Sequence, residues 1–267
     1  MGLTQLNLDG KTKVEVSINR LRYAATLAGS EGLYLAFSGG KDSQSVYDLA
    51  VVSEVKFDAH YNMTGVDAPE LVQFIRDYYP KVEMHRPPQS IFKSVQTMGL
   101  PRRQARWCCE LLKEFRGSGR WVITGVRWAE SPQRQSRQSI EVCRTDKTKY
   151  YVNPIIEWST SEVWEYLKTQ GLPYCSLYDE GATGPYRGDG EFKRLGCVMC
   201  PMTTYRQTMA QAARWPKIAE AWRRAAYRYH AKDIPSVKQW ATPEEFWQWW
   251  LSRRGQPKAS AQCVMFE

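Results

Sequence analysis

A short apolar run followed at once by two glycines and a lysine constrains this chain more than any other feature. Residues 33–37 (Leu-Tyr-Leu-Ala-Phe) have the length and composition of a strand buried on both faces, and residues 43–54 carry apolar side chains at helical spacing. The segment that joins them reads Ser38-Gly39-Gly40-Lys41-Asp42-Ser43. We therefore predict a strand, a tight glycine turn and a helix, with an anion bound at the turn.

The residue types in this turn are those of a phosphate site. Gly39 and Gly40 can adopt positive φ values and let backbone N–H groups approach an anion, and the following helix adds the donors of its N-terminus. Lys41 adds a full positive charge, while Ser38 and Ser43 add hydroxyl groups. The spacing differs from that of the nucleoside triphosphatase loop, in which four residues separate the first glycine from the Gly-Lys pair.

Strands and helices alternate along the first two thirds of the chain. After a helix at 14–29, we predict further strands at 57–63, 82–85, 121–125 and 150–152, and further helices at 69–79, 91–98 and 159–169. This alternation predicts an α/β fold with a doubly wound, mostly parallel sheet. Residues 171–202 are rich in Gly and Pro, and residues 203–254 return to helix. We expect a nucleotide-binding domain at 1–202 with a helical C-terminal region at 203–267 packed on it.

Positive charge is in excess and unevenly placed. The chain has 37 Lys and Arg against 28 Asp and Glu, and the excess lies in residues 101–149 and 203–267. It fits either a polyanionic partner or a basic surface that keeps the protein in solution. No apolar stretch is long enough for a membrane span, and the N-terminus lacks the pattern of a secretory signal, so we expect a cytoplasmic protein.

Four of the seven cysteines form two pairs, Cys108-Cys109 and Cys197-Val198-Met199-Cys200. Paired thiolates commonly bind iron–sulfur clusters or zinc. Adjacent cysteines on a helix point in different directions, which suits a cluster with spaced iron atoms better than one tetrahedral zinc ion. We predict an iron–sulfur cluster, with zinc or four buried thiols as alternatives. The histidines His60, His85 and His230 show no spacing that predicts a metal site or a catalytic pair.

Taken together, the motifs resemble the PP-loop ATP pyrophosphatase superfamily and, within it, the phosphoadenosine phosphosulfate (PAPS) reductase family. The segment 38–43 is similar to the phosphate loop of the superfamily. Four further segments are similar to family motifs, at residues 62–70, 125–134, 153–158 and 172–181. The resemblance spans roughly residues 30–205 and implies an adenine nucleotide α-hydrolase-like fold, with its site at the carboxyl ends of the strands.

The resemblance also implies roles for individual residues. The loop 38–43 would bind phosphates, and Arg127 and Arg134 would contact phosphate or sulfate groups. Further nucleotide contacts are implied at Thr64, Gly65, Gly125, Glu130 and Ser131. The adenosine phosphosulfate (APS) reductases of the family bind a [4Fe–4S] cluster through the same vicinal-pair and Cys-x-x-Cys pattern, which implies the ligands Cys108, Cys109, Cys197 and Cys200. A thiol electron donor such as thioredoxin is implied with them.

Two departures from the reductases leave the nucleotide open among ATP, APS and PAPS. Sulfonucleotide reductases usually lack the loop lysine, whereas Lys41 is present and suits the triphosphate of ATP bound with Mg²⁺. Lys41 and Asp42 are then predicted to be catalytic, with Asp42, or else Asp67, helping to bind Mg²⁺. The reductases also carry a nucleophilic cysteine near the C-terminus, for which Cys263 is the candidate, although its neighbours match the family signature poorly.

Three functions remain in competition. The first is an enzyme of sulfur metabolism, either a sulfonucleotide reductase or an ATP-dependent adenylyl transferase that passes sulfur on. The second is a nucleic-acid-thiolating enzyme in which the Trp and Arg residues of 203–254 bind the polymer, although Trp at helical spacing more often belongs to a core. The third, a zinc-dependent nucleic-acid binder without activity, leaves the phosphate loop unused. The sequence favours the first.

Overall fold

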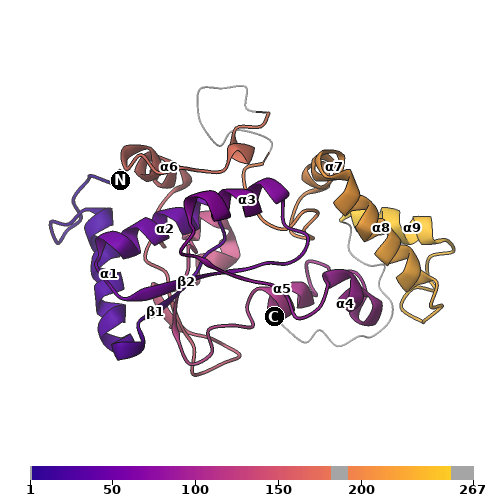
Figure 1. Cartoon of the computed structure of the whole chain (residues 1–267), viewed down its shortest axis with the longest axis horizontal. Coiled ribbons are helices and arrows are strands. Elements are labelled where there is room, and N and C mark those ends of the chain that lie inside the picture. Colours follow the sequence, from indigo (N-terminus) through magenta and orange to yellow (C-terminus); the bar gives the residue numbers. More distant parts are fainter. Residues whose placement is uncertain (1, 182–191, 254–267) are drawn as a thin grey trace. The chain divides into compact units, whose positions relative to one another are not determined.

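The computed structural model describes residues 2–181 and 192–253 and shows an α/β protein (Figure 1). The chain separates into two compact units, residues 1–88 with 108–197 and residues 89–107 with 198–267. The second unit therefore combines an internal segment with the C-terminal part of the chain. The expected boundary between residues 202 and 203 stays a prediction.

The first unit is built on a six-stranded sheet. Its strands are β1 (Leu33–Ala36), β2 (Phe57–Asn62), β3 (Glu83–His85), β4 (Trp121–Ile123), β5 (Ile140–Val142) and β6 (Tyr150–Val152). Their order is β3-β2-β1-β4-β6-β5, and every neighbouring pair is parallel except β5 with β6. The α/β fold with a mostly parallel sheet is confirmed. The antiparallel edge strand β5 was not predicted, because its two apolar residues, Ile140 and Val142, lie in an otherwise polar stretch of sequence.

Helices and one irregular segment pack on this sheet. The helices are α1 (Lys13–Ala28), α2 (Lys41–Val52), α3 (Pro69–Tyr78), α5 (Trp107–Leu112) and α6 (Thr160–Thr169). Helix α2 lies against α1 and α6 (Figure 1). The segment 113–117 lies beside β1 and β4, since a Cβ on Gly117 would be 2.9 Å from a side-chain carbon of Val122 and 3.6 Å from one of Tyr34. Lys149 Nζ donates to the carbonyl oxygens of Glu114 and Arg116 in this segment at 2.9 and 2.6 Å.

The strand order places a crevice beside β1. From β1 the chain moves outward through β2 to β3 and then returns to β4 on the other side of β1. In parallel α/β sheets, ligands bind outside the carboxyl ends of the strands at such a reversal. Leu35 pairs with Ile123 in register, so the segments that follow β1 and β4 leave the sheet next to each other.

The second unit is helical and has an aromatic core. It contains α4 (Ile91–Met98), α7 (Tyr205–Arg214), α8 (Pro216–His230) and α9 (Pro243–Ser252), with α8 packed against α4, α7 and α9. Five tryptophans are at most 8% exposed, namely Trp215, Trp222, Trp240, Trp247 and Trp250. The interpretation of the tryptophans as core is confirmed for these five, and buried rings cannot stack on bases.

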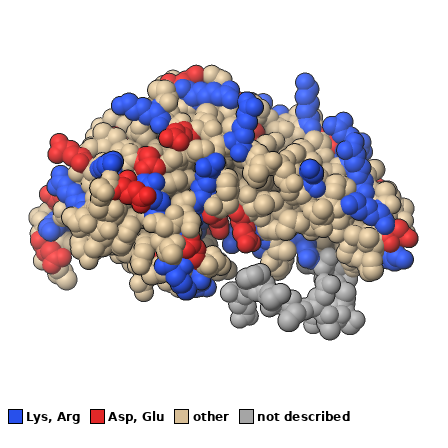
Figure 2. Space-filling view, turned by 60° about the horizontal axis from the view of Figure 1, so that its bottom comes forward, with Lys and Arg blue, Asp and Glu red and all other residues tan. Residues whose placement is uncertain are grey.

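Basic and acidic side chains are interspersed on one face of the molecule (Figure 2). On the face drawn in Figure 2, Lys and Arg side chains lie among neutral and acidic ones and do not gather in one place. Part of the basic excess of α8 is paired locally, as Arg223 Nε lies 2.9 Å from Glu220 Oε2. Among the described residues no helix is long and apolar enough to cross a bilayer.

A capping box at the start of α6 is linked to α1 by an ion pair. The Ser159 side chain accepts a hydrogen bond from the Glu162 amide at 3.2 Å, and the Glu162 carboxylate accepts one from the Ser159 amide at 2.7 Å. Lys13 Nζ lies 2.7 Å from the same carboxylate, which is 5% exposed. Burial alone would raise the pKa of Glu162, but the hydrogen bonds from Lys13 and Ser159 outweigh burial and lower this pKa below its ordinary 4.5.

We predict that Glu162→Gln lowers the free energy of unfolding at pH 7 by about 1–3 kcal/mol, since a charged hydrogen bond is lost while the cap is kept. Because the folded-state pKa is depressed, the contribution is present above the ordinary value of 4.5 and disappears as pH falls through the folded value. Urea unfolding of both proteins across this range measures it. The exposed Glu165→Gln on the same helix is the control, and a difference that grows in acid would contradict the prediction.

Candidate nucleotide site

The loop after β1 has a backbone that requires glycine at one position. Gly39 has a φ of +70°, in the left-handed region. A Cβ built on Gly39 would lie 2.7 Å from a side-chain carbon of Ile75 and 2.8 Å from one of Leu71, both in α3. The turn predicted from the two glycines is therefore formed tightly against α3. Gly40 is the N-cap of α2 and has no side chain to cap the amides that follow.

Hydrogen bonds within the loop fix its shape. Ser43 Oγ accepts from the Ser38 amide at 3.2 Å and donates to the Gly40 carbonyl oxygen at 2.9 Å. Gln44 Nε2 donates to the Gly39 carbonyl oxygen at 2.8 Å. Side chains in the first turn of α2 thus hold the carbonyl groups of Gly39 and Gly40 in place. Ser43, expected to contact phosphate, thus has a positioning role within the loop.

Tyr178 closes the loop from a distant segment. It ends the 3₁₀ turn η4 (Ser176–Tyr178), and its hydroxyl oxygen accepts a hydrogen bond from the Lys41 amide at 3.0 Å. Burial raises the pKa of Tyr178 far above its ordinary value, so the phenol stays protonated. A protonated phenol that accepts from an amide still has its own O–H to donate.

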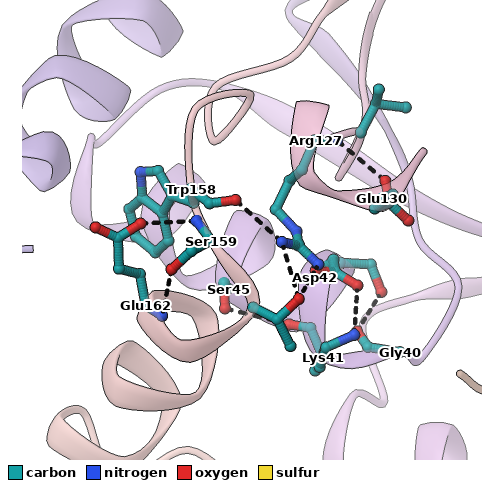
Figure 3. Close-up of polar contacts among 12 residues, drawn as sticks. Gly40, Lys41, Asp42, Ser45, Arg127, Glu130, Trp158, Ser159 and Glu162 are labelled. Carbon is teal, nitrogen blue, oxygen red and sulfur yellow. Dashed lines mark hydrogen bonds and ion pairs between the residues drawn. The ribbon is translucent and has the colours of Figure 1, made fainter. Parts of the chain in front are cut away.

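The carboxylate of Asp42 lies between two cations (Figure 3). Lys41 Nζ is 3.1 Å from Asp42 Oδ2, and Arg127 Nε is 2.6 Å from Asp42 Oδ1. Arg127 is only 2% exposed and also donates to the carbonyl oxygen of Trp158 at 3.0 Å. Burial lowers the pKa of Lys41, and Asp42 counteracts this effect. Arg127 therefore lies behind the loop and supports Asp42.

The segments after β1 and β4 are in contact through a second glycine. A Cβ on Gly125 would lie 3.1 Å from the backbone carbon and from Cβ of Asp42. This close approach explains why a residue without a side chain occupies the position. Gly39 and Gly125 thus allow the two segments to meet at the start of α2.

A second group of charges surrounds Glu130. Its carboxylate is ion-paired with Arg134 and, at 2.6 Å, with Arg194, and it accepts from the Arg127 amide at 3.0 Å. Burial, followed by the charges of Arg194 and Arg137, lowers the pKa of Arg134 to about 10. Arg134 remains a cation at neutral pH, in a region where positive charge is crowded and an anion is favoured. Arg194 was not predicted to belong to the site, because it lies in none of the recognised sequence motifs.

The remaining predicted residues have local roles in the structure. Ser131 lies between the two short 3₁₀ turns at 128–130 and 132–134. Gly65 has a φ of +79°, and the Asp67 carboxylate accepts from the Thr64 amide and hydroxyl at 2.6 and 2.9 Å. Asp67 is buried in this turn, whereas Asp42, the other carboxylate considered for Mg²⁺, lies in the first turn of α2, directly after the loop glycines.

The predicted cluster ligands belong to both units. Cys108 and Cys109 lie in α5, where neighbouring residues point about 100° apart, as 3.6 residues per turn require. Cys197 forms a β-bridge with Asp67, and its thiol donates to Thr64 Oγ1 at 3.5 Å. Cys200 belongs to the second unit. None of the six described cysteines forms a disulfide. The predicted nucleophile Cys263 lies outside the described residues.

A mostly parallel α/β sheet with a glycine–lysine loop at its strand reversal defines the class of fold. The chain belongs to the phosphoadenosine phosphosulfate reductase domain family, whose model matches residues 32–203. It is 26% identical over 220 residues to an adenosine 5'-phosphosulfate reductase of Shouchella clausii, covering 77% of this chain and 85% of that protein.

Other relatives are longer proteins. An uncharacterised protein of Methanocaldococcus jannaschii is 27% identical over 228 residues, which cover 80% of this chain and 45% of that protein. A second uncharacterised protein of the same organism is 23% identical, with 89% of this chain and 56% of that protein covered. The chain thus spans about half the length of these two relatives.

Two solved structures show weaker likeness. The PAPS reductase from Candida auris has a TM-score of 0.48 and 17% identity, covering 73% of this chain and all of that chain. The Candida glabrata FMN adenylyltransferase with FMN and an ATP analogue has a TM-score of 0.47 and 15% identity, covering 70% of this chain and 61% of that chain.

We predict that Gly39→Ala destabilises the protein more than Gly171→Ala does. Both glycines have a positive φ, but an added Cβ at Gly171 meets nothing within 4 Å, whereas at Gly39 it overlaps Ile75 and Leu71. Gly171→Ala should lower the free energy of unfolding by about 1–2 kcal/mol, through left-handed backbone strain alone. Denaturant unfolding of the two variants measures the difference, and equal losses would show that α3 does not confine the loop.

Proposed function

We propose that this protein binds an adenine nucleotide with the polyphosphate against the loop 38–43, and that the nucleotide is ATP. The observation that carries the proposal is the lysine at the first position of α2, beside Asp42 and close to the loop backbone. APS has no β-phosphate, whereas the pyrophosphate of ATP would extend along the loop to the Lys41 ammonium group. The retained Lys41 is therefore explained by ATP and unexplained by APS.

The charges around the loop support this assignment. Asp42 is neutralised by Lys41 and Arg127, so the three groups together carry one net positive charge. Glu130 with Arg134 and Arg194 carries a further positive charge. A polyphosphate is stabilised by such fixed cations and by the amides of the helix N-terminus, which need little reorganisation during reaction.

The reaction that fits these groups is adenylyl transfer. An oxygen nucleophile of the acceptor forms a bond to the α-phosphorus, the bond from this phosphorus to the bridging oxygen breaks, and pyrophosphate leaves. Mg²⁺ would neutralise charge on the phosphates, with Asp42 as the carboxylate next to the loop. The adenylated acceptor can then exchange AMP for a sulfur nucleophile, which gives the sulfur chemistry expected in this family.

We further propose a [4Fe–4S] cluster with Cys108, Cys109, Cys197 and Cys200 as its ligands. Four thiols in two pairs are a suitable donor set, and two adjacent cysteines of one helix point in different directions, which suits a cluster better than a single small ion. A cluster, when bound, supplies one-electron chemistry or a site for sulfur. Reduction of a sulfonucleotide with this cluster and a thiol donor such as thioredoxin is the alternative reaction.

The first test compares ATP with APS as ligands. Lys41→Ala should weaken Mg²⁺–ATP binding about 100-fold or more while it changes APS binding little, because APS has no pyrophosphate to contact. Calorimetric titration of both nucleotides measures this, and pyrophosphate release from ATP should fall in parallel. Lys168→Ala, an exposed lysine of α6, is the control. Equal losses for both nucleotides, or APS binding without ATP binding, would overturn the ATP assignment.

The second test concerns the cluster. Protein purified without oxygen should contain about four iron and four sulfide ions per chain, and Cys108→Ser should remove most of both. Cys143→Ser is the matched control, since Cys143 is buried outside the two cysteine pairs and its thiol contacts Thr145. Iron and sulfide content report the result. One zinc ion per chain without sulfide would reject the cluster.

A further inference from the structure

Two of the three histidines meet on neighbouring strands of the sheet. His60 lies in β2 and His85 ends β3, and the register pairs His60 with Glu83 and Asn62 with His85. His60 Nδ1 and His85 Nε2 are 2.8 Å apart. Their spacing in the sequence does not indicate this contact, because parallel strand pairing brings together residues that are 25 positions apart.

Glu83 completes a set of three ligand atoms. One carboxylate oxygen lies 3.6 Å from His60 Nδ1 and 3.8 Å from His85 Nε2. A triangle with sides of 2.8, 3.6 and 3.8 Å has a circumscribed circle with a radius of about 2.0 Å, which is the length of a zinc–nitrogen or zinc–oxygen bond. An ion near its centre would be at bonding distance from all three atoms at once.

Neighbouring side chains fix the orientation of His60. His60 Nε2 is hydrogen-bonded to the Asp58 carboxylate, which is itself ion-paired with Arg120. Because a carboxylate accepts, Nε2 carries the hydrogen and the lone pair of Nδ1 faces Glu83 and His85. The ring of Tyr34 stacks on His60 with centroids 4.2 Å apart and planes 8° apart. A carboxylate behind a histidine ligand is the usual outer arrangement of a protein metal site.

Charge and access also favour a cation. The carboxylates of Glu83, Asp58 and Glu31 outnumber the nearby cations, Arg120 and Arg116, by one. The side chains of His60 and His85 are 10% and 16% exposed, whereas that of Glu83 is 63% exposed. The nitrogen ligands are thus shielded, and the carboxylate side is open to solvent. Three protein ligands with an open side leave a fourth position for water.

We propose that His60, Glu83 and His85 bind a divalent transition-metal ion of the zinc type, at a site separate from the four paired cysteines and from the nucleotide loop. Imidazole and carboxylate ligands suit zinc and its neighbours in the transition series. The ion would join β3, the edge strand of the sheet, to β2 by a bond between side chains. The proposal does not depend on which nucleotide the protein binds.

Nitrogen NMR of the histidine rings tests the site directly. With ¹⁵N-labelled histidine the full-length protein gives three pairs of ring signals, one for each histidine. Adding zinc chloride to chelator-treated protein should shift the ring signals of His60 and His85 and leave those of His230 unchanged. Zinc bound by cysteines would leave all three histidines unaffected, so the two kinds of site are told apart.

Variants make the result specific. His85→Gln and Glu83→Gln should each abolish the zinc-dependent shift of His60, and Asp58→Asn should weaken zinc binding about 10–100-fold by removing the supporting carboxylate. His230→Gln is the control and should retain both shifts. The proposal is overturned if zinc leaves His60 and His85 unchanged, which would mean that they only share a hydrogen bond, or if the His60 shift survives in His85→Gln and Glu83→Gln.

Discussion

The ion pairs of Asp42 connect three parts of the first unit. Its carboxylate joins the N-terminus of α2 to Arg127 in the segment after β4, and Arg127 in turn contacts the Trp158 carbonyl oxygen just before α6. Removing one partner of a buried ion pair leaves an uncompensated charge, which is strongly destabilising. The relative positions of the loop and the segment after β4 therefore depend on this one carboxylate.

The arginines around the site have two different roles. Arg127 is buried and its guanidinium group is directed at protein atoms, so it orders the loop. Arg134 and Arg194 share Glu130 and remain partly exposed. Residue type alone indicated only that arginines would bind an anion. Only packing distinguishes the arginine that supports the loop from those that can still meet a ligand.

Much of the fold was predictable because its signals are local. The buried run before Gly39, the Pro at the start of α3 and the capping residues of α6 each mark an element boundary within a residue or two of the observed one. The features that were missed depend on contacts between distant residues. The pairing of His60 with His85 follows from strand register, and the pairing of Arg194 with Glu130 joins residues 64 positions apart. Neither leaves a pattern in a single sequence.

The two outer strands of the sheet, β3 and β5, have only three residues each. An exposed strand edge offers unpaired amides and carbonyl groups to any passing extended chain, and a short edge with charged side chains is a poor template for such pairing. Both outer strands carry a glutamate, Glu83 and Glu141. Each edge of the sheet therefore offers few unpaired backbone groups to another chain and presents a carboxylate beside them, which disfavours edge-to-edge aggregation.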